Sequence, residues 1–216
     1  MAQIITAEGV GFRYAGTPVL NEVTLGVDSA ETLVLTGPNG SGKSTLLHLL
    51  AGVEVPSEGT VRRPEGLRLA LLPQRTSGMD ALPLTVAECV RIGRFTPGRL
   101  LRRLTRSDHT AVADVLAQLG LTALAGRRLR ELSGGQRQRT LLAQTLVQDA
   151  DVYALDEPTA ALDAASAHRV RELLAHRRQE GAAIVLASHD DAESALADRT
   201  VELGHTRTGA GSRRRA

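Results

Sequence analysis

The sequence of 216 residues is short of several residue types, and each shortage excludes a class of protein. Its single cysteine, Cys89, cannot form an internal disulfide. Because Cys89 lies in a segment with apolar periodicity, we expect a small core residue rather than a reactive thiol. No apolar run approaches the roughly 20 residues needed to cross a bilayer, and the start lacks a basic region followed by a long apolar stretch. The sequence therefore predicts a globular chain without a membrane span or a signal peptide.

Aromatic residues are also scarce, since the chain has two Phe, two Tyr and no Trp. This bears on two arginine-rich stretches: residues 91–106, which contain six arginines and no acid, and the tail from Arg207. Nucleic acid or membrane headgroups could bind either stretch. Because neither has the interleaved aromatics of a base-stacking surface, we favour a solvated face for the first and a basic, disordered tail at 207–216 for the second.

Lysine is the rarest charged residue, because 26 residues are Lys or Arg and only one of them, Lys43, is lysine. It lies in Gly-Pro-Asn-Gly-Ser-Gly-Lys-Ser-Thr, residues 37–45, which matches the phosphate-binding pattern G-x-x-x-x-G-K-[ST]. An apolar run at 32–36 predicts a buried strand before this loop, and residues 45–52 read as a helix that glycine ends. Backbone N–H groups of residues 40–45 would converge on phosphates, with the Ser44 hydroxyl available to Mg²⁺. The expected ligand is a Mg-nucleotide.

A second apolar run, residues 151–157, ends in the carboxylate pair Asp156 and Glu157. At the end of a strand, Asp156 can hold Mg²⁺ through water, and Glu157 can polarise a water in line with the γ-phosphate. An Asp-Glu pair alone is commonly a solvated turn. About 110 residues after a phosphate loop and directly before Pro158, it predicts the metal and base positions of a nucleotide site.

The segment Leu-Ser-Gly-Gly-Gln-Arg-Gln-Arg, residues 132–139, has the pattern of another phosphate-facing helix start. Ser133 is a typical helix N-cap, two glycines allow close backbone approach, and residues 140–147 continue as a helix. The alternative is an ordinary capped helix. Together with Lys43 and the carboxylate pair, the pattern favours a nucleotide contact.

On these residues the chain resembles the nucleotide-binding subunit of an ABC transporter over residues 3–203. Residues 37–45 match the Walker A loop, 132–136 the LSGGQ signature, and 152–156 the Walker B strand, with Glu157 in the position of the general base. The resemblance places nucleotide contacts on Gly37, Pro38, Asn39, Gly40, Ser41, Gly42, Lys43, Ser44, Thr45, Ser133, Gly134, Gly135 and Gln136.

Four further positions follow from the resemblance. Gln74 matches the Q-loop glutamine, which touches Mg²⁺ and the transmembrane partner, and His189 matches the switch histidine that contacts the γ-phosphate. Tyr14 stands where the family stacks an aromatic on adenine. The D-loop reads Ala160-Ala161-Leu162-Asp163. It therefore lacks the family's usual serine, although Asp163 is kept, and the resemblance implies that Asp163 contacts the nucleotide site.

The implied fold is an α/β P-loop NTPase of ABC ATPase type. It has a RecA-like core, an N-terminal antiparallel β portion and a helical subdomain inserted at about 75–131. We expect residues 1–206 to form this single ABC ATPase domain.

The resemblance also implies partners and a place. Two copies would stack head to tail with each ATP between Lys43 of one and the Ser133 helix start of the other. A transmembrane permease subunit and an extracytoplasmic substrate-binding protein would complete the complex, with no nucleic acid. The chain would lie at the cytoplasmic face of the cell membrane as a peripheral subunit.

For the cargo, the stretches 72–75 and 82–94 resemble the zinc and manganese importer branch most. An exporter ATPase is the alternative, because the cassette chemistry does not fix direction, and a soluble non-transport ABC ATPase is less favoured. Five histidines are scattered without a zinc-site spacing, and we interpret them as structural or surface residues. They are His48, His109, His168, His176 and His205.

Overall fold

The computed structural model describes residues 2–74, 83–95, 103–204 and 211–214. The chain divides into two compact units. The first unit comprises residues 1–74, 150–157 and 176–216, and the second comprises 75–149 and 158–175. The second unit begins at the residue where we placed the helical insertion, but it extends beyond residue 131. One boundary falls between Glu157 and Pro158.

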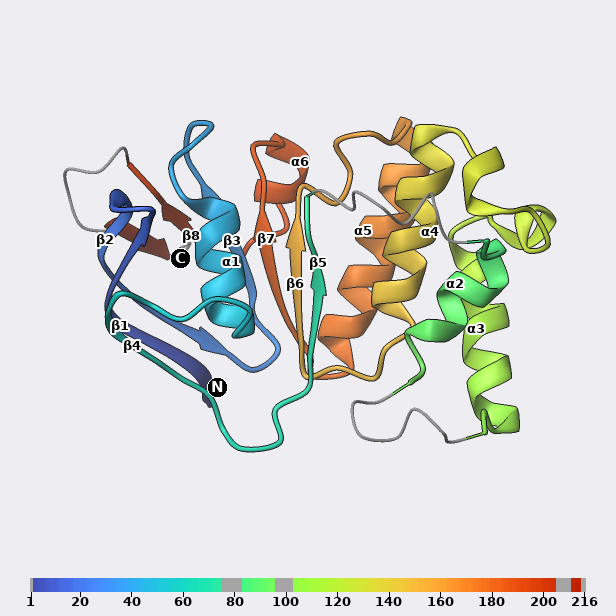
Figure 1. Ribbon diagram of the computed structural model, residues 1–216, viewed down its shortest axis with the longest axis horizontal. Coiled ribbons are helices and arrows are strands. Elements are labelled where there is room, and N and C mark those ends of the chain that lie inside the picture. Colours follow the sequence, from blue (N-terminus) through green and yellow to red (C-terminus); the bar gives the residue numbers. More distant parts are fainter. Residues whose placement is uncertain (1, 75–82, 96–102, 205–210, 215–216) are drawn as a thin grey trace. The chain divides into compact units, whose positions relative to one another are not determined.

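A six-stranded sheet in the order β5-β6-β7-β3-β8-β9 forms the centre of the first unit (Figure 1). All pairings are parallel except that of β8 with β9. Strands β6 and β7 are buried along their whole length, as continuous apolar runs in a parallel sheet require. The strands are β3 (Thr32–Thr36), β5 (Leu69–Leu72), β6 (Val152–Asp156), β7 (Ala183–Ala187), β8 (Arg199–Glu202) and β9 (Gly211–Arg214).

The register of this sheet brings the carboxyl ends of its inner strands to one edge. Leu35 of β3 and Asp156 of β6 both pair with Ala187 of β7. The segments that follow these strands carry the predicted phosphate loop, the carboxylate pair and the switch histidine. In an open α/β sheet this edge is where ligands bind.

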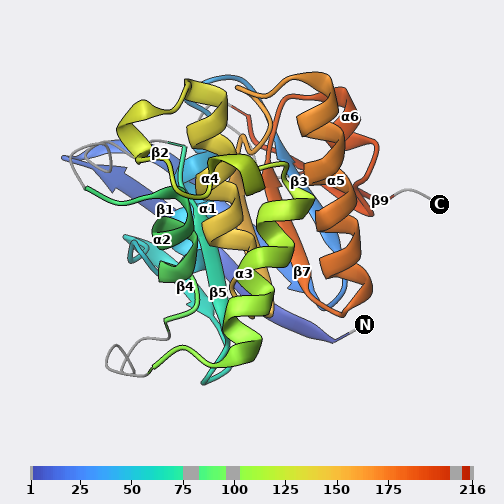
Figure 2. The same cartoon turned by 90° about the vertical axis from the view of Figure 1, so that its right-hand side faces the viewer.

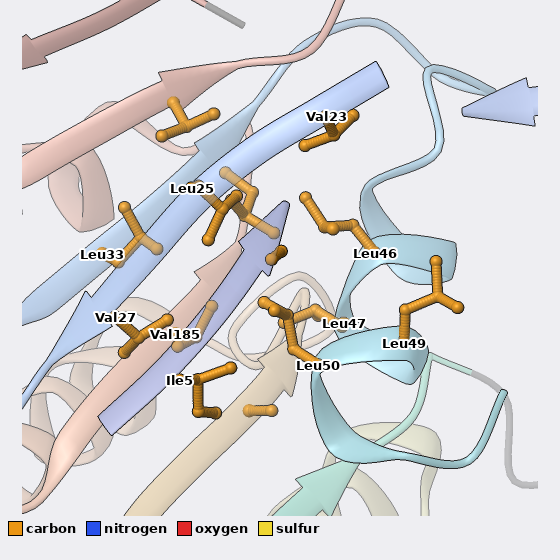
Figure 3. Packing of buried hydrophobic residues seen from close by; sticks show 14 of the residues in the cluster. Ile5, Val23, Leu25, Val27, Leu33, Leu46, Leu47, Leu49, Leu50 and Val185 are labelled. Atoms are coloured by element: carbon orange, nitrogen blue, oxygen red, sulfur yellow. The ribbon is translucent and has the colours of Figure 1, made fainter. Parts of the chain in front are cut away.

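An antiparallel sheet in the order β2-β1-β4 accompanies the parallel one, as predicted for the N-terminal portion. Helix α1 lies in the same unit, and its leucines pack with apolar residues of β1, β2 and β3 (Figure 3). The elements are β1 (Gln3–Tyr14), β2 (Thr17–Asp28), α1 (Lys43–Ala51) and β4 (Glu58–Arg62). The buried leucines of α1, at positions 46, 47, 49 and 50, anchor in the core the helix that directly follows the phosphate loop.

The second unit is helical, and Figure 2 shows α2, α3 and α4 within it. Helices α2, α3 and α4 each begin with a capping box, in which Thr85, Thr105 and Ser133 respectively exchange hydrogen bonds with the residue three positions later. The helices are α2 (Val86–Ile92), α3 (Arg106–Gln118), the 3₁₀ turns η2 (Thr122–Leu124) and η3 (Leu129–Glu131), and α4 (Gly134–Leu146). Helix α5 (Ala164–Gln179) begins in this unit and ends in the first, which also contains α6 (Asp191–Ser194).

The arginine-rich segment differs from the solvated face that we expected. Arg94 forms an ion pair with Asp108, Nε to Oδ1 at 2.9 Å, and the two side chains are only 20% and 2% exposed. Arg94 also donates to the Val147 carbonyl at 2.8 Å. The solvated interpretation is therefore wrong for Arg94, because its acid lies on the following helix rather than in the segment itself.

The tail also differs in part, since Gly211–Arg214 of the predicted disordered segment form β9 beside β8. Backbone pairing at an open sheet edge does not need an apolar sequence, which explains why the composition gave no signal. Several expectations fall outside the described residues: Q-loop residues 75–82, Arg99, Arg102, His205 and residues 207–210. Among the helices that the structure describes, none combines the length and apolarity of a membrane span.

Candidate nucleotide-binding site

A cavity of about 340 Å³ opens at the carboxyl edge of the parallel sheet. Its lining comes from the phosphate loop and from the segments after β5, β6 and β7, all within the first unit. The lining residues are Val19, Asn39, Gly40, Gly42, Lys43, Ser44, Thr45, Gln74, Glu157 and His189. The sequence predicted all of these except Val19, an apolar strand residue for which no motif gives a signal.

The phosphate loop depends on glycine at two positions. Gly42 precedes α1 in a left-handed conformation, φ 94°, and a Cβ there would overlap the Leu20 side chain. Gly37 has φ 136°, and a Cβ there would overlap the Leu203 carbonyl oxygen. Any side chain at either position would push the loop away from the sheet, so the pattern's glycines are required by geometry.

Lys43 is almost wholly buried, at 6% exposure, and begins α1. Its Nζ donates hydrogen bonds to the carbonyl oxygens of Gly37 at 2.7 Å and Pro38 at 3.0 Å. The ammonium group is thus held by the loop that it would serve. A ligand phosphate would have to replace these carbonyls as the acceptor.

Asp156 ends β6 with its side chain buried, and its Oδ2 has no hydrogen-bond partner among the described residues. Burial raises the pKa of this carboxyl, and the Ser44 side chain opposes the rise by hydrogen bonding. An unpaired buried carboxylate oxygen beside a serine hydroxyl is a donor set that suits Mg²⁺. The residues therefore fit the metal of a Mg-nucleotide.

Glu157 directly follows β6 with a left-handed backbone, φ 47°, which is uncommon for a residue other than glycine. Its N–H donates to the Ala187 carbonyl at 2.9 Å. Its Oε1 lies 3.3 Å from Nδ1 of His189, whose side chain is 67% exposed while that of Glu157 is 17% exposed. The structure therefore brings the predicted base and the predicted switch histidine together at the cavity.

Ser188 shapes this edge, and the sequence analysis did not single it out. Its buried hydroxyl accepts the Asp190 N–H at 2.9 Å, and its own N–H donates to Leu35 at 3.1 Å. The turn around His189 is thereby fixed to β3. A serine before a histidine carries no signal in a single sequence.

Tyr14 stands apart from the residues that line the cavity. Its ring is 46% exposed and packs edge to face on Phe12, with centroids 4.8 Å apart. An exposed ring held by a neighbour could present a flat face to a base. Its adenine contact stays a prediction.

The signature residues belong to the second unit. Ser133 Oγ accepts the Gln136 N–H at 3.3 Å, and Gln136 Oε1 accepts the Ser133 N–H at 3.1 Å. A Cβ on Gly135 would lie 3.0 Å from the Ala161 carbonyl oxygen of the D-loop. The start of α4 is thus a capped helix N-terminus that packs closely on the D-loop, as a phosphate-facing helix start with glycines would allow.

Asp163 of the D-loop precedes α5 and caps it. Its Oδ1 accepts the Ser166 N–H and its Oδ2 the Ser166 hydroxyl, both at 2.8 Å. These bonds lower the pKa of Asp163. The sequence predicted this residue as a nucleotide-site contact, whereas the structure shows both carboxylate oxygens engaged within the chain.

The structure tests the expectation that Cys89 is a core residue and not a reactive thiol. Cys89 is fully buried, and burial raises the pKa of its thiol to about 11, which confirms a core residue. Over the described part of the chain, His, Cys, Asp and Glu side chains form no cluster of three that could hold a metal ion.

Comparisons with known proteins agree with this site. The family model described as ABC transporter matches residues 20–160. The chain is 36% identical over 209 residues to the high-affinity zinc uptake system ATP-binding protein ZnuC of Bacillus subtilis, covering 93% of this chain and 90% of the relative. It is 37% identical over 208 residues to the zinc transport system ATP-binding protein AdcC of Streptococcus pneumoniae, covering 92% and 89%. Identity is 41% over 220 residues to the hemin import ATP-binding protein HmuV of Streptomyces coelicolor, covering 96% and 77%.

A solved structure described as an inward-facing metal-chelate type ABC transporter matches with a TM-score of 0.83 at 29% identity, over 99% of this chain and 84% of the other. A dimeric bacterial ABC transporter cassette also has a TM-score of 0.83, at 22% identity, over 99% of this chain and all of the other. The second likeness supports the fold alone. Both agree with the α/β cassette described above.

Proposed function

The chain belongs to the ABC transporter family as an ATP-hydrolysing, ATP-binding subunit, and we propose that it powers the import of a divalent transition metal cation, zinc or manganese. The assignment of the cargo rests on one observation: the likeness to zinc uptake subunits extends over about nine tenths of both chains. A likeness confined to the cassette motifs would say nothing of cargo, because those motifs serve all cassettes.

We assign the nucleotide to the cavity at the phosphate loop. Lys43 would exchange its bonds to the loop carbonyls for the β- and γ-phosphate oxygens, and the backbone N–H groups of residues 40–45 would bind the same phosphates. The Ser44 hydroxyl, the Asp156 carboxylate and the Gln74 amide would hold Mg²⁺, which supplies charge neutralisation of the triphosphate. The unpaired Oδ2 of Asp156 supports this assignment.

Glu157 would act as the general base that orients and deprotonates the attacking water. Its contact with His189 supports a role for the histidine beside the γ-phosphate, where it would sense whether that phosphate is present. Tyr14 would stack on the adenine, since its ring is exposed.

We further propose that two copies of the chain enclose each ATP. The first unit supplies Lys43 and Glu157, and the signature helix start at Ser133 comes from the second copy. Two phosphate-facing helix N-termini then neutralise one triphosphate. Hydrolysis removes the γ-phosphate contacts to the opposite signature, so the closed pair loses its differential stabilisation and opens.

The proposed complex includes a transmembrane permease that docks beside Gln74 and the segment 82–94, and an extracytoplasmic substrate-binding protein. The chain would lie on the cytoplasmic face of the membrane. Cargo would bind these partners and not this chain.

Import of a metal chelate is the second candidate. Two observations favour it: the 41% identity to the hemin import subunit and the 29% identity to the metal-chelate type transporter. Free cation and chelate would be distinguished by the permease and the binding protein, because this chain would not touch either cargo.

Deletion of the gene, with the wild-type chain or the Glu157→Gln variant returned, tests the cargo. We expect lower cell zinc or manganese in the deletion strain and slow growth under chelation, with rescue by added cation and by wild type only. Rescue by hemin with unchanged zinc and manganese would favour the chelate. Outward movement of solute by vesicles with the full complex would overturn import and leave the ATPase intact.

A complementation experiment tests the shared site. Lys43→Ala protein and Ser133→Arg protein should each be inactive, but their heterodimer contains one intact composite site. We therefore expect partial recovery of hydrolysis on mixing. If confirmed heterodimers recover no activity, each site is made within one chain.

A further inference from the structure

The D-loop of this chain lacks the serine that the family usually has at its first position, where Ala160 stands. A serine hydroxyl is nevertheless present six residues later, at Ser166. That side chain is buried, at 1% exposure, and it lies on the first turn of α5. Its position connects the D-loop to a basic side chain farther along the helix.

A chain of hydrogen bonds runs through Ser166. The Ser166 hydroxyl donates to Asp163 Oδ2 at 2.8 Å and accepts from Arg169 Nη2 at 3.3 Å. A hydroxyl between a cation and a carboxylate is polarised in one direction, so each bond strengthens the other. Arg169 thus acts on the Asp163 carboxylate without touching it.

Helix α4, the signature helix that begins after Ser133, contributes Arg139 near the same glycine as Arg169. A Cβ placed on Gly120 would lie 3.7 Å from both Arg169 Nη2 of α5 and Arg139 Nη1 of α4. Arg139 Nη1 also donates to the Leu119 carbonyl at 3.5 Å, at the C-terminus of α3. The charge of Arg139 helps to lower the pKa of Asp163, so a side chain of α4 acts on the D-loop carboxylate.

Near its start, α4 touches the D-loop directly, because Gly135 packs against the Ala161 carbonyl. The D-loop and the signature helix therefore meet at Gly135, and Arg139 of α4 also acts electrostatically on Asp163 of the D-loop. The boundary between the units falls after Glu157, so the D-loop belongs to the unit that carries the signature and not to the one that carries the base.

We propose that Arg169 is a positioning residue that acts through Ser166 on Asp163, so that the D-loop and the signature helix of one copy move as a single piece onto the ATP site of the other copy. Arg169 touches neither nucleotide nor metal. The proposal rests on the shared-site model above and adds which protomer must carry Arg169 for a given site to work.

The heterodimer of Lys43→Ala and Ser133→Arg chains tests this placement. Its one intact site takes the signature and D-loop from the Lys43→Ala chain. Arg169→Gln in that chain should lower turnover about tenfold with the KM for ATP little changed, as for the loss of one hydrogen bond from a charged group. The same substitution in the Ser133→Arg chain should leave turnover unchanged.

Matched controls separate positioning from folding. Arg171→Gln removes the same charge from the same helix and should have no effect in either chain. Arg169→Lys should recover part of the turnover, and Ser166→Ala should show the same asymmetry as Arg169→Gln. The melting temperature of each Arg169 variant should stay within about 2 °C of wild type.

Equal losses in both placements, or no loss in either, would overturn the proposal, since a purely structural role has no reason to depend on the protomer. Failure of the parent heterodimer to recover hydrolysis would instead overturn the shared site. The two failures are therefore distinguishable in one set of measurements.

Discussion

Asp156→Asn should make the nucleotide-free chain more stable while removing its activity. The carboxyl is 2% exposed, and its Oδ2 is buried without a hydrogen-bond partner among the described residues. A buried unsatisfied polar group costs about 1–3 kcal/mol, and more when charged. The amide of asparagine has the same shape and no charge, but its buried oxygen still lacks a hydrogen-bond partner. We therefore expect the free energy of unfolding to rise by only about 1 kcal/mol. For a chain of this length that is about 2–4 °C in melting temperature.

The stability difference between Asp156→Asn and wild type should depend on pH in a direction that the pKa of Asp156 determines. Burial raises the pKa of Asp156 in the folded chain, so the folded state takes up this proton more readily than the unfolded state does. The penalty of the ionised form therefore exists at neutral pH and disappears as the pH falls through the raised pKa. The advantage of the Asn variant should be largest near pH 7 and should shrink toward about pH 4.

Asp151→Asn, at the other end of β6, is the matched control with the opposite sign. Hydrogen bonding by the Arg68 side chain, Nη2 to Oδ1 at 2.7 Å, lowers the pKa of Asp151. Its stabilisation is present at neutral pH and is lost as the pH falls. Because both side chains are partly exposed, the loss in the variant should be small.

Thermal unfolding of the three chains between about pH 4 and 8, without and with Mg-ATP, measures both effects. Mg-ATP should raise the melting temperature of wild type and much less that of Asp156→Asn, because the variant has lost a metal ligand. A lower melting temperature for Asp156→Asn than for wild type at neutral pH without nucleotide would refute the reasoning.

Three further substitutions test other parts of the site and its support. Lys43→Arg should weaken ATP binding or turnover at least about tenfold, because a guanidinium does not fit where the buried Nζ bonds two loop carbonyls; nucleotide titration and phosphate release measure this, and near wild-type hydrolysis would contradict it. Glu157→Gln should bind ATP, hydrolyse it slowly and accumulate as a dimer on size-exclusion chromatography, whereas a monomer with wild-type turnover would remove Glu157 as the base. Asp108→Asn should cost about 3 kcal/mol in urea unfolding, because Arg94, whose side chain is only 20% exposed, loses its ion pair; a cost below about 1 kcal/mol would mean that the pair is dispensable.

Local pattern was sufficient for the elements that hold the site. The apolar run at 32–36 is β3 at the same bounds, and the helix expected from residue 45 begins two residues earlier, at Lys43. The sheet edge could be predicted because each motif follows its own strand. The family resemblance then supplied the fold class, which the comparisons confirm.

Contacts between distant residues could not be predicted in this way. Arg94 has no acid in its own segment, and its partner Asp108 lies 14 residues away on helix α3. The capping bonds that Asp163 accepts from Ser166, three residues later, are local and were not anticipated, and its contact with the nucleotide stays a prediction. Single-sequence patterns report which face of an element is apolar, and they do not report which polar groups meet across elements.

The left-handed backbone at Glu157 means that folding stability favours glycine at this position, whereas catalysis requires a carboxylate. A side chain there costs about 1–2 kcal/mol relative to glycine, which adopts φ 47° freely. Glycine has no carboxylate, so selection for folding and selection for turnover favour different residues at the end of β6. A population of variants screened only for expression and heat resistance should lose glutamate at this position, while growth that depends on transport should restore it.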